Sequence, residues 1–275
     1  MAGFSHAVSQ WSGALPLWTA LILLVAAEMW RPLLDRPEEP RGRIAGNVAM
    51  GIVNAGLSLV LPVSTVFSAE WAARHQIGLM NVVVLPTAAA IAATLLLRSL
   101  ATYGVHRLSH IVPLFWRVHR VHHSDTRLDL STGFRNHPLD LAIAAPCLAL
   151  ATIACGLSAS TLIAYEAVSV VFSLWTHTNV RLPERLDRAL RTILVTPAMH
   201  YVHHTRLREE YDSNYGDMLS LWDRLFGTYR VVAADVLVTR EYGLGDASDA
   251  EAASFVRQIR SPFDSASAVG LPSEA

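Results

Sequence analysis

The sequence predicts an all-α integral membrane protein: a helical bundle with four or five spanning or re-entrant helices and a cytoplasmic histidine-rich cap. Three observations support this prediction. The 275 residues are 52% hydrophobic and only 16% charged, below the roughly 25% of charged residues usual in soluble domains. Several apolar runs approach the ~20 residues that a helix needs to cross a bilayer. Ten of the 12 histidines lie between His106 and His204.

Five apolar runs are candidates for membrane helices, and they cover residues 14–30, 44–67, 82–97, 139–155 and 162–175. The third run can continue past Arg98 and Tyr103 and leave the bilayer. The last two runs are joined by the short, turn-like segment 156–160. Because a connection of this length suits antiparallel neighbours, we expect these runs to form a helical hairpin.

The arginines predict an orientation. Four of them follow the first run: Arg31, Arg36, Arg41 and Arg43. By the positive-inside rule, this side of the membrane is cytoplasmic. The second run then ends on the far side, where we expect a short loop with Glu70, Arg74 and His75. The third run and the hairpin bring the later histidines back to the cytoplasmic side.

The chain divides into N-terminal membrane helices (1–80), a histidine-rich domain (81–232) and a C-terminal tail (233–275). The composition of the tail from residue 245 predicts a weakly ordered end with one short helix near 252–259. Glu166 lies inside the fifth run, and a carboxylate in a membrane helix is a candidate for a functional site. We interpret it instead as a partly buried side chain paired with a neighbouring polar group.

Eight histidines fall into three windows of five residues: His106 and His110, then His119, His122 and His123, then His200, His203 and His204. Residues three or four positions apart share one face of a helix, whereas adjacent residues diverge by ~100°. An adjacent pair such as His122 and His123 can therefore reach two different metal ions. Eight imidazoles are more than one ion can bind, so the windows predict two metals.

Not every histidine of this chain is expected to bind a metal. A lone histidine is usually an ordinary packing residue, and we assign His6 and His75 to that class. Eight clustered rings would each need a donor and an acceptor satisfied, and imidazole is the commonest metal ligand in proteins. Arg107 stands where a zinc protease has its catalytic glutamate. The net charge of −1 gives no basic field that would point to nucleic acid.

The three windows resemble the histidine boxes of the fatty acid hydroxylase/sterol desaturase superfamily, which consists of membrane non-haem di-iron enzymes. The resemblance covers about residues 82–230. Besides the boxes, it is carried by residues 103–107, 115–119, 134–138, 175–179, 212–216 and 221–228.

This resemblance implies that residues 81–232 form a di-iron domain, with two iron ions as cofactor and O2 as co-substrate. The implied activity is hydroxylation or desaturation of a fatty acyl chain, a sterol or a related lipid. The alternative is a non-catalytic membrane protein that binds or transports metal. Zinc is a possible substitute for iron in purified protein. The implied catalytic residues and metal ligands are His106, His110, His119, His122, His123, His200, His203 and His204, with His177 as a ninth metal ligand.

Other residues of the matching segments are expected to support the ligands. His137 is either a supporting or a purely structural residue. Candidates to accept the free ring N–H of a ligand are Asp125, Asp129, Asp140, Asp212 and Asn214; for Asp125 and Asp129 we favour a solvated loop residue or a helix cap. The sequence has no dinucleotide fingerprint and no cysteine set for a cluster. Electrons are therefore expected from a separate ferredoxin, cytochrome or reductase.

Overall fold

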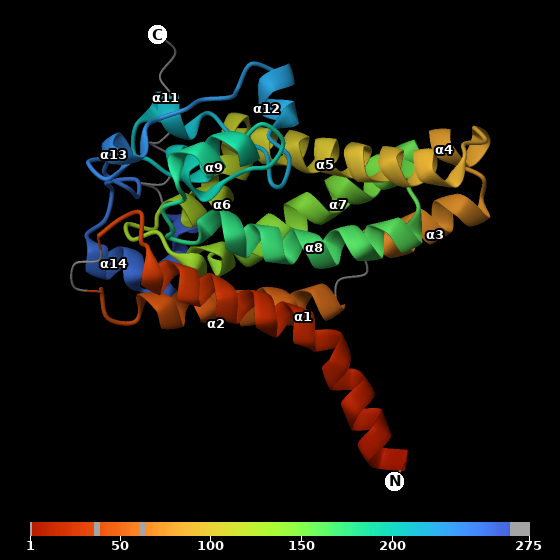
Figure 1. Cartoon of the computed structure of the whole chain (residues 1–275), viewed down its shortest axis with the longest axis horizontal. Coiled ribbons are helices and arrows are strands. Elements are labelled where there is room, and N and C mark those ends of the chain that lie inside the picture. Colours follow the sequence, from red (N-terminus) through yellow and green to blue (C-terminus); the bar gives the residue numbers. More distant parts are fainter. Residues whose placement is uncertain (1, 36–38, 61–63, 265–275) are drawn as a thin grey trace.

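The computed structural model describes residues 2–35, 39–60 and 64–264, with side chains from residue 15 onward. The five long helices are α1 (Ala2–Trp30), α2 (Arg43–Val60), α5 (Thr87–Ile111), α7 (Pro138–Cys155) and α8 (Ala159–His177). They form a bundle along the long axis, except that the N-terminal part of α1 extends away from it (Figure 1). Within the described ranges the only other regular elements are short helices, and no strand is formed. The all-α prediction is confirmed.

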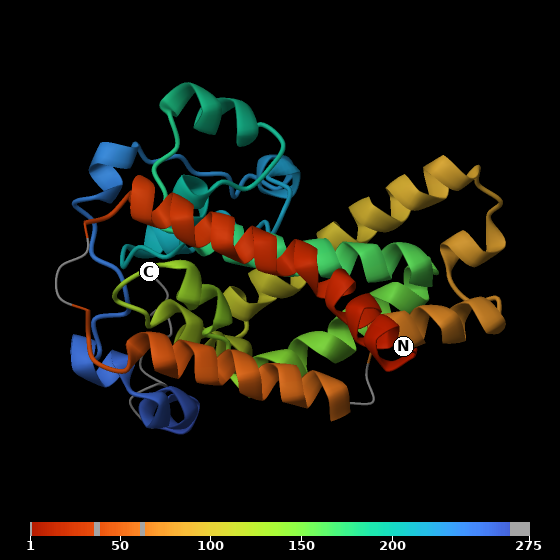
Figure 2. The same cartoon turned by 60° about the horizontal axis from the view of Figure 1, so that its bottom comes forward.

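The short helices gather at the two ends of the bundle (Figure 1). One end holds α3 (Thr65–Arg74) and α4 (Leu79–Val82). The other end is a cap, and Figure 2 shows its elements around the ends of α1 and α2. The cap consists of α6 (Pro113–His123), η1 (Leu130–Phe134), α9 (Glu184–Leu190), α10 (Pro197–His203), α11 (Arg208–Tyr211), α12 (Leu221–Leu225), α13 (Ala234–Leu237), α14 (Asp249–Ala253), α15 (Phe255–Arg260) and η2 (Ser261–Phe263).

Four segments are long and apolar enough to cross a membrane: Arg43–Val82, Thr87–Ile111, Pro138–Cys155 and Ala159–His177. The part of α1 whose side chains are described, Leu15–Trp30, is apolar but shorter than these four segments. Large apolar side chains such as those of Ile52, Leu150 and Ile163 point outward from the bundle. Because water would disfavour such a surface and lipid would not, the chain is an integral membrane protein.

Two details of the predicted helices are wrong. The second run was expected to continue to residue 67, but Ser64 is extended and a separate helix, α3, begins at Thr65. Ser64 caps α3, because its side chain accepts a hydrogen bond from the backbone N–H of Phe67. Glu70 and Arg74 therefore lie in a helix rather than in a loop, and His75 is its C-terminal cap.

The predicted short turn between the last two runs is confirmed, but the expected hairpin of packed neighbours is not formed: α7 and α8 diverge from the turn, and each packs against α3 and α5 instead. Gly156 ends α7 in the left-handed conformation, with φ 70°, and Ser158 caps the start of α8. At the same end of the bundle Gly78 has φ 99°, and a Cβ there would lie 2.3 Å from the carbonyl oxygen of Ile153. Only glycine allows the start of α4 to approach α7 this closely.

Glu166 has the polar partner that the sequence analysis expected. Its Oε1 accepts hydrogen bonds from Arg98 Nη2, at 2.8 Å, and from Thr65 Oγ1, at 3.3 Å. The ion pair joins α5 to α8 inside the bundle. Arg98 is 68 residues away in the chain, which is why sequence reasoning did not identify it.

The tail is more ordered than predicted, up to residue 264. Ser248 and Glu251 form a capping box at the start of α14. Both α14 and α15 pack against α2, and the carbonyl of Ala252 accepts a 2.6 Å hydrogen bond from Arg135 Nη2. Burial of Ala252 and Ala253 and this buried guanidinium hold the segment in place.

Two buried polar contacts tie the N-terminal helices to the cap. Asn179 Oδ1 accepts from the backbone N–H groups of Leu33 and Leu34 after α1. At the start of α2, Arg43 pairs with Asp125, at 2.9 Å, and with Asp129. These contacts fix the ends of α1 and α2 beside the segments that carry the histidines.

Candidate metal centre

Four elements bring nine histidines together at the junction of bundle and cap. Helix α5 carries His106 and His110, α6 carries His119, His122 and His123, α8 ends at His177, and α10 with its C-terminal cap carries His200, His203 and His204. The two short helices among these, α6 and α10, begin with proline at the first helical position. The side chain of Thr196 caps α10. The starts of α6 and α10 are thus encoded locally.

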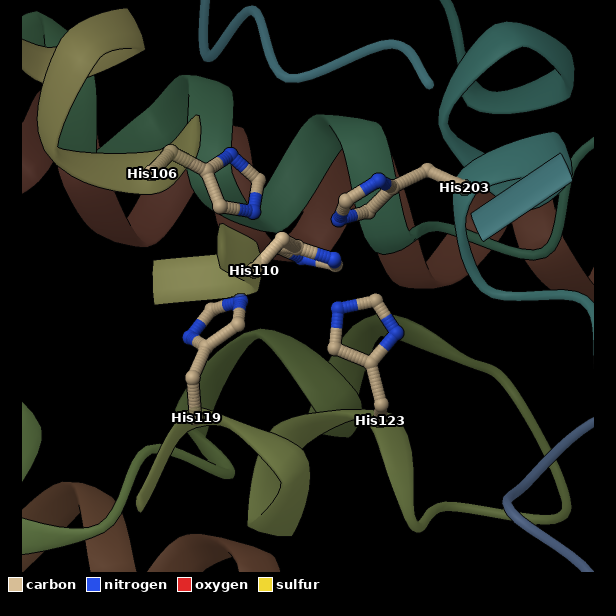
Figure 3. A group of neighbouring side chains, drawn as sticks. All are labelled: His106, His110, His119, His123 and His203. Carbon is tan, nitrogen blue, oxygen red and sulfur yellow. The ribbon is translucent and has the colours of Figure 1, made fainter. Parts of the chain in front are cut away.

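The nine rings form two groups. We call His106, His110, His119, His123 and His203 the five-histidine group, and His122, His177, His200 and His204 the four-histidine group. In each group, one nitrogen per ring lies within 4.8 Å of the corresponding nitrogens of the others. Figure 3 shows the five rings of the first group arranged around a common centre.

Adjacent histidines are divided between the groups, as the helical geometry predicted. His122 and His123 belong to different groups, with ring planes 88° apart. His203 and His204 are divided in the same way, also at 88°. Each adjacent pair therefore contributes one ring to each group from a single helix turn.

In the five-histidine group every buried Nε2 lacks a hydrogen-bond partner among the described residues. On the opposite side of the rings, four Nδ1 atoms have oxygen acceptors. These are the Tyr215 carbonyl for His106 (2.8 Å), Asp212 Oδ1 for His110 (3.4 Å), Asp140 Oδ2 for His119 (3.0 Å) and the Ser213 carbonyl for His203 (2.7 Å). A ring that donates from Nδ1 keeps its lone pair on Nε2, so these contacts favour the metal-binding tautomer.

In the four-histidine group the Nε2 atoms approach one another. His177 Nε2 lies 3.1 Å from His122 Nε2 and 3.0 Å from His200 Nε2, which lies 3.1 Å from His204 Nε2. A neutral ring nitrogen carries either one N–H or one lone pair, so these four nitrogens can form at most two full hydrogen bonds, and one of the three contacts stays unsatisfied. A shared cation would account for all three contacts, because every Nε2 could then point its lone pair at the cation. Metal–imidazole bonds of about 2.1 Å are compatible with nitrogens this close together.

Five of the nine rings are in the neutral state that metal binding requires. Burial lowers the pKa of five rings outside the spanning helices well below the usual value, and neighbouring rings lower it further. We call these five the cap histidines: His122, His123, His200, His203 and His204. They are neutral at pH 7, and metal binding needs neutral imidazole. The residues present therefore fit first-row metals that accept imidazole.

The expected supporting residues have mixed outcomes. Asp140 and Asp212 accept ring N–H groups, as predicted. Asp129 caps η1, which confirms the helix-cap interpretation. For Asp125 both interpretations, an acceptor for a ring N–H and a solvated loop residue or helix cap, are wrong. Its side chain is buried and bonds Arg43, Asn47 and Thr132.

The prediction that Asn214 accepts a ring N–H is wrong, since its Oδ1 accepts from the backbone N–H of Arg230 instead. His137 lies away from both groups: its Nδ1 accepts from Leu139 N, and its Nε2 lies 3.2 Å from the Ile259 carbonyl oxygen. Both ring nitrogens are engaged in holding backbone, so the residue is structural. His75 is exposed, as expected of an ordinary residue, and the side chain of His6 lies outside the described residues.

Sequence reasoning missed the acceptors at Ser213 and Tyr215, because they are backbone carbonyls and carry no side-chain signal. It also missed a stacked pair that covers the five-histidine group. The rings of Trp116 and Tyr211 are 5.5 Å apart at 9°, and Trp116 contacts His110 and His123.

The fold and site define a helical membrane protein with a buried polyhistidine metal-binding centre. The fatty acid hydroxylase family model matches residues 91–228, about half of the chain. The chain belongs to this family.

Named relatives agree with this assignment. The chain is 33% identical over 142 residues to human alkylglycerol monooxygenase (52% of this chain, 30% of that protein). It is 29% identical over 182 residues to the ornithine lipid hydroxylase of Rhizobium tropici (65% of this chain, 51% of that protein). The match thus spans about a third to a half of each relative's length. No solved structure matches the chain.

Proposed function

We propose that this protein is an O2-dependent lipid hydroxylase in which nine histidines hold two iron ions. The observation that carries the proposal is the division of nine histidine rings into groups of five and four with converging nitrogens. The eight histidines of the three boxes are the proposed catalytic ligands, and His177 completes the four-histidine group. Zinc would bind the same rings without supporting the oxidation.

Bound iron would supply activation of O2 and oxidation of a C–H bond, with the overall balance R–H + O2 + 2 e⁻ + 2 H⁺ → R–OH + H2O. The residues of this chain hold the ligands in one tautomer, through oxygens such as Asp140 Oδ2 and the Tyr215 carbonyl. Burial of the rings excludes water and limits side reactions at the centre.

The substrate is a membrane lipid with a polar headgroup. Two relatives support this, since one is named for alkylglycerol and the other for ornithine lipid. Both names describe oxygen insertion, which favours hydroxylation over desaturation. The histidines lie on the ends of the apolar helices α5 and α8 and on α6 and α10 of the cap, which places the centre beside the bilayer in this proposal.

The cap faces the cytoplasm in this proposal. Arg74 is the arginine at the α3–α4 end of the described bundle, whereas Arg31, Arg41 and Arg43 lie at the cap end. The electron donor is a separate ferredoxin, cytochrome or reductase, which would approach the cap from the cytoplasm.

The test is metal analysis and product analysis on the same samples. Wild-type protein should hold about two irons per chain and, with a chemical reductant and isotopically labelled O2, transfer one labelled oxygen atom to membrane lipid. His204→Ala should lose metal and product, while His75→Ala, which alters an exposed histidine, should lose neither. Iron flux into liposomes without any oxidised lipid would support metal transport and overturn the enzyme proposal.

A further inference from the structure

The two histidine groups differ in what holds their rings. In the five-histidine group, four Nδ1 atoms have oxygen acceptors, whereas in the four-histidine group His177 alone has them, including the Ser173 carbonyl at 2.6 Å. The buried Nδ1 atoms of the other three rings have no partner among the described residues, and they belong to His122, His200 and His204. The first group is therefore preorganised and the second is not.

Three of the four acceptors come from one short segment, residues 212–215. It offers Asp212 Oδ1 and the carbonyls of Ser213 and Tyr215 to three rings that come from α5 and α10. The shape of the segment is unusual, because Asn214 has φ 53°. Its side chain secures that conformation by bonding the backbone of Met199 and Arg230.

Asp223 anchors the segment without touching any histidine. Its fully buried carboxylate accepts from the backbone N–H groups of Tyr215, at 2.8 Å, and Gly216, at 2.9 Å, and from Thr228 Oγ1, at 2.7 Å. A Cβ on Gly216 would lie 2.8 Å from Asp223 Oδ2, so the carboxylate sits directly against this backbone.

We propose that the two metal positions are inequivalent and that Asp223 is the positioning residue responsible. The five-histidine group holds its metal more tightly than the four-histidine group, which is the first to lose metal. Loss of one ligand-orienting contact typically lowers metal affinity by about 10–100-fold, and Asp223 supports the segment that provides three of them. This inference rests on the metal centre proposed above.

The experiment is stepwise removal of iron from purified protein in detergent with increasing chelator, followed by measurement of iron per chain. In the wild-type protein, iron per chain should fall to a plateau near one as the chelator concentration rises. The His177→Ala variant should contain only this retained iron before any chelator is added. Asp223→Asn should lower the affinity for the retained iron by about 10–100-fold, so that the plateau disappears. Thr228→Val, which removes one hydrogen bond to Asp223, should lower this affinity by a smaller factor.

A matched control is Asp187→Asn. Asp187 is also buried and bonded, to Arg191 in its own helix region, but has no contact with the 212–216 segment. It should release iron as the wild type does. Loss of both irons at one chelator concentration in the wild type, or equal behaviour of the Asp187 and Asp223 variants, would overturn the inference. Wild-type protein that binds no metal would overturn the metal centre itself.

Discussion

The contact between Arg43 and Asp125 should be worth much more than an exposed ion pair of the same chemistry. Both side chains are 1% exposed. Asp125→Ala would remove the acceptor for Arg43 Nη1, Asn47 Nδ2 and Thr132 Oγ1, which lie at 2.9, 3.1 and 2.8 Å. It would leave a buried guanidinium with one fewer carboxylate.

Removing one partner of a buried pair costs about 3–5 kcal/mol. The low end applies here, because Asp129 and Glu39 still bond Arg43. At about 2–4 °C per kcal/mol for chains of comparable size, a loss of ~3 kcal/mol lowers Tm by about 6–12 °C. Asp125→Asn keeps one acceptor oxygen and should lose less.

The control is Glu184→Ala on α9. Glu184 also pairs with an arginine, Arg188, but the two side chains are 79% and 65% exposed, so the loss should be below about 1 kcal/mol. The assay is thermal unfolding of metal-free protein in detergent at a fixed scan rate, followed by tryptophan fluorescence. Equal shifts in the Asp125 and Glu184 variants would refute the reasoning.

Three further predictions concern the membrane, the cap and pH. Glu166→Ala should cost about 1.5–3 kcal/mol, since it removes the carboxylate oxygen that accepts from Arg98 Nε and Nη2; Glu166→Gln should melt at a higher temperature than Glu166→Ala, and the reverse order would contradict the pairing. His137→Ala should lower stability by about 1 kcal/mol through loss of the α7 cap, yet leave iron per chain unchanged; a variant with less iron would show that His137 acts on the centre. In metal-free protein, burial lowers the folded-state pKa of the cap histidines, so the unfolded state binds protons first as pH falls. Stability should therefore drop below pH ~6.5 by about 1.4 kcal/mol per pH unit for each such ring, and a Tm that is constant from pH 7 to 5 would contradict this.

Local sequence determined the helices and most of the candidate ligands. Apolar runs of bilayer length can only be helices in lipid, because every backbone polar group must be satisfied within the segment. The spacing in the three histidine windows already placed His122 and His123 on different sides of one helix. The interruption at Ser64 was missed, because the apolar composition continues across it.

Tertiary structure decided what lies far apart in the chain. The partner of Glu166 is Arg98, 68 residues away, and no local pattern encodes such a distance. Asp125 and Asp129 look alike in sequence and both pair with Arg43, yet Asp125 also bonds Asn47 while Asp129 caps η1. The acceptors for His106 and His203 are backbone carbonyls, which every residue possesses. The residue types therefore determined which chemistry is available, whereas the fold decided which rings share a centre and what orients them, because orientation depends on contacts between distant segments.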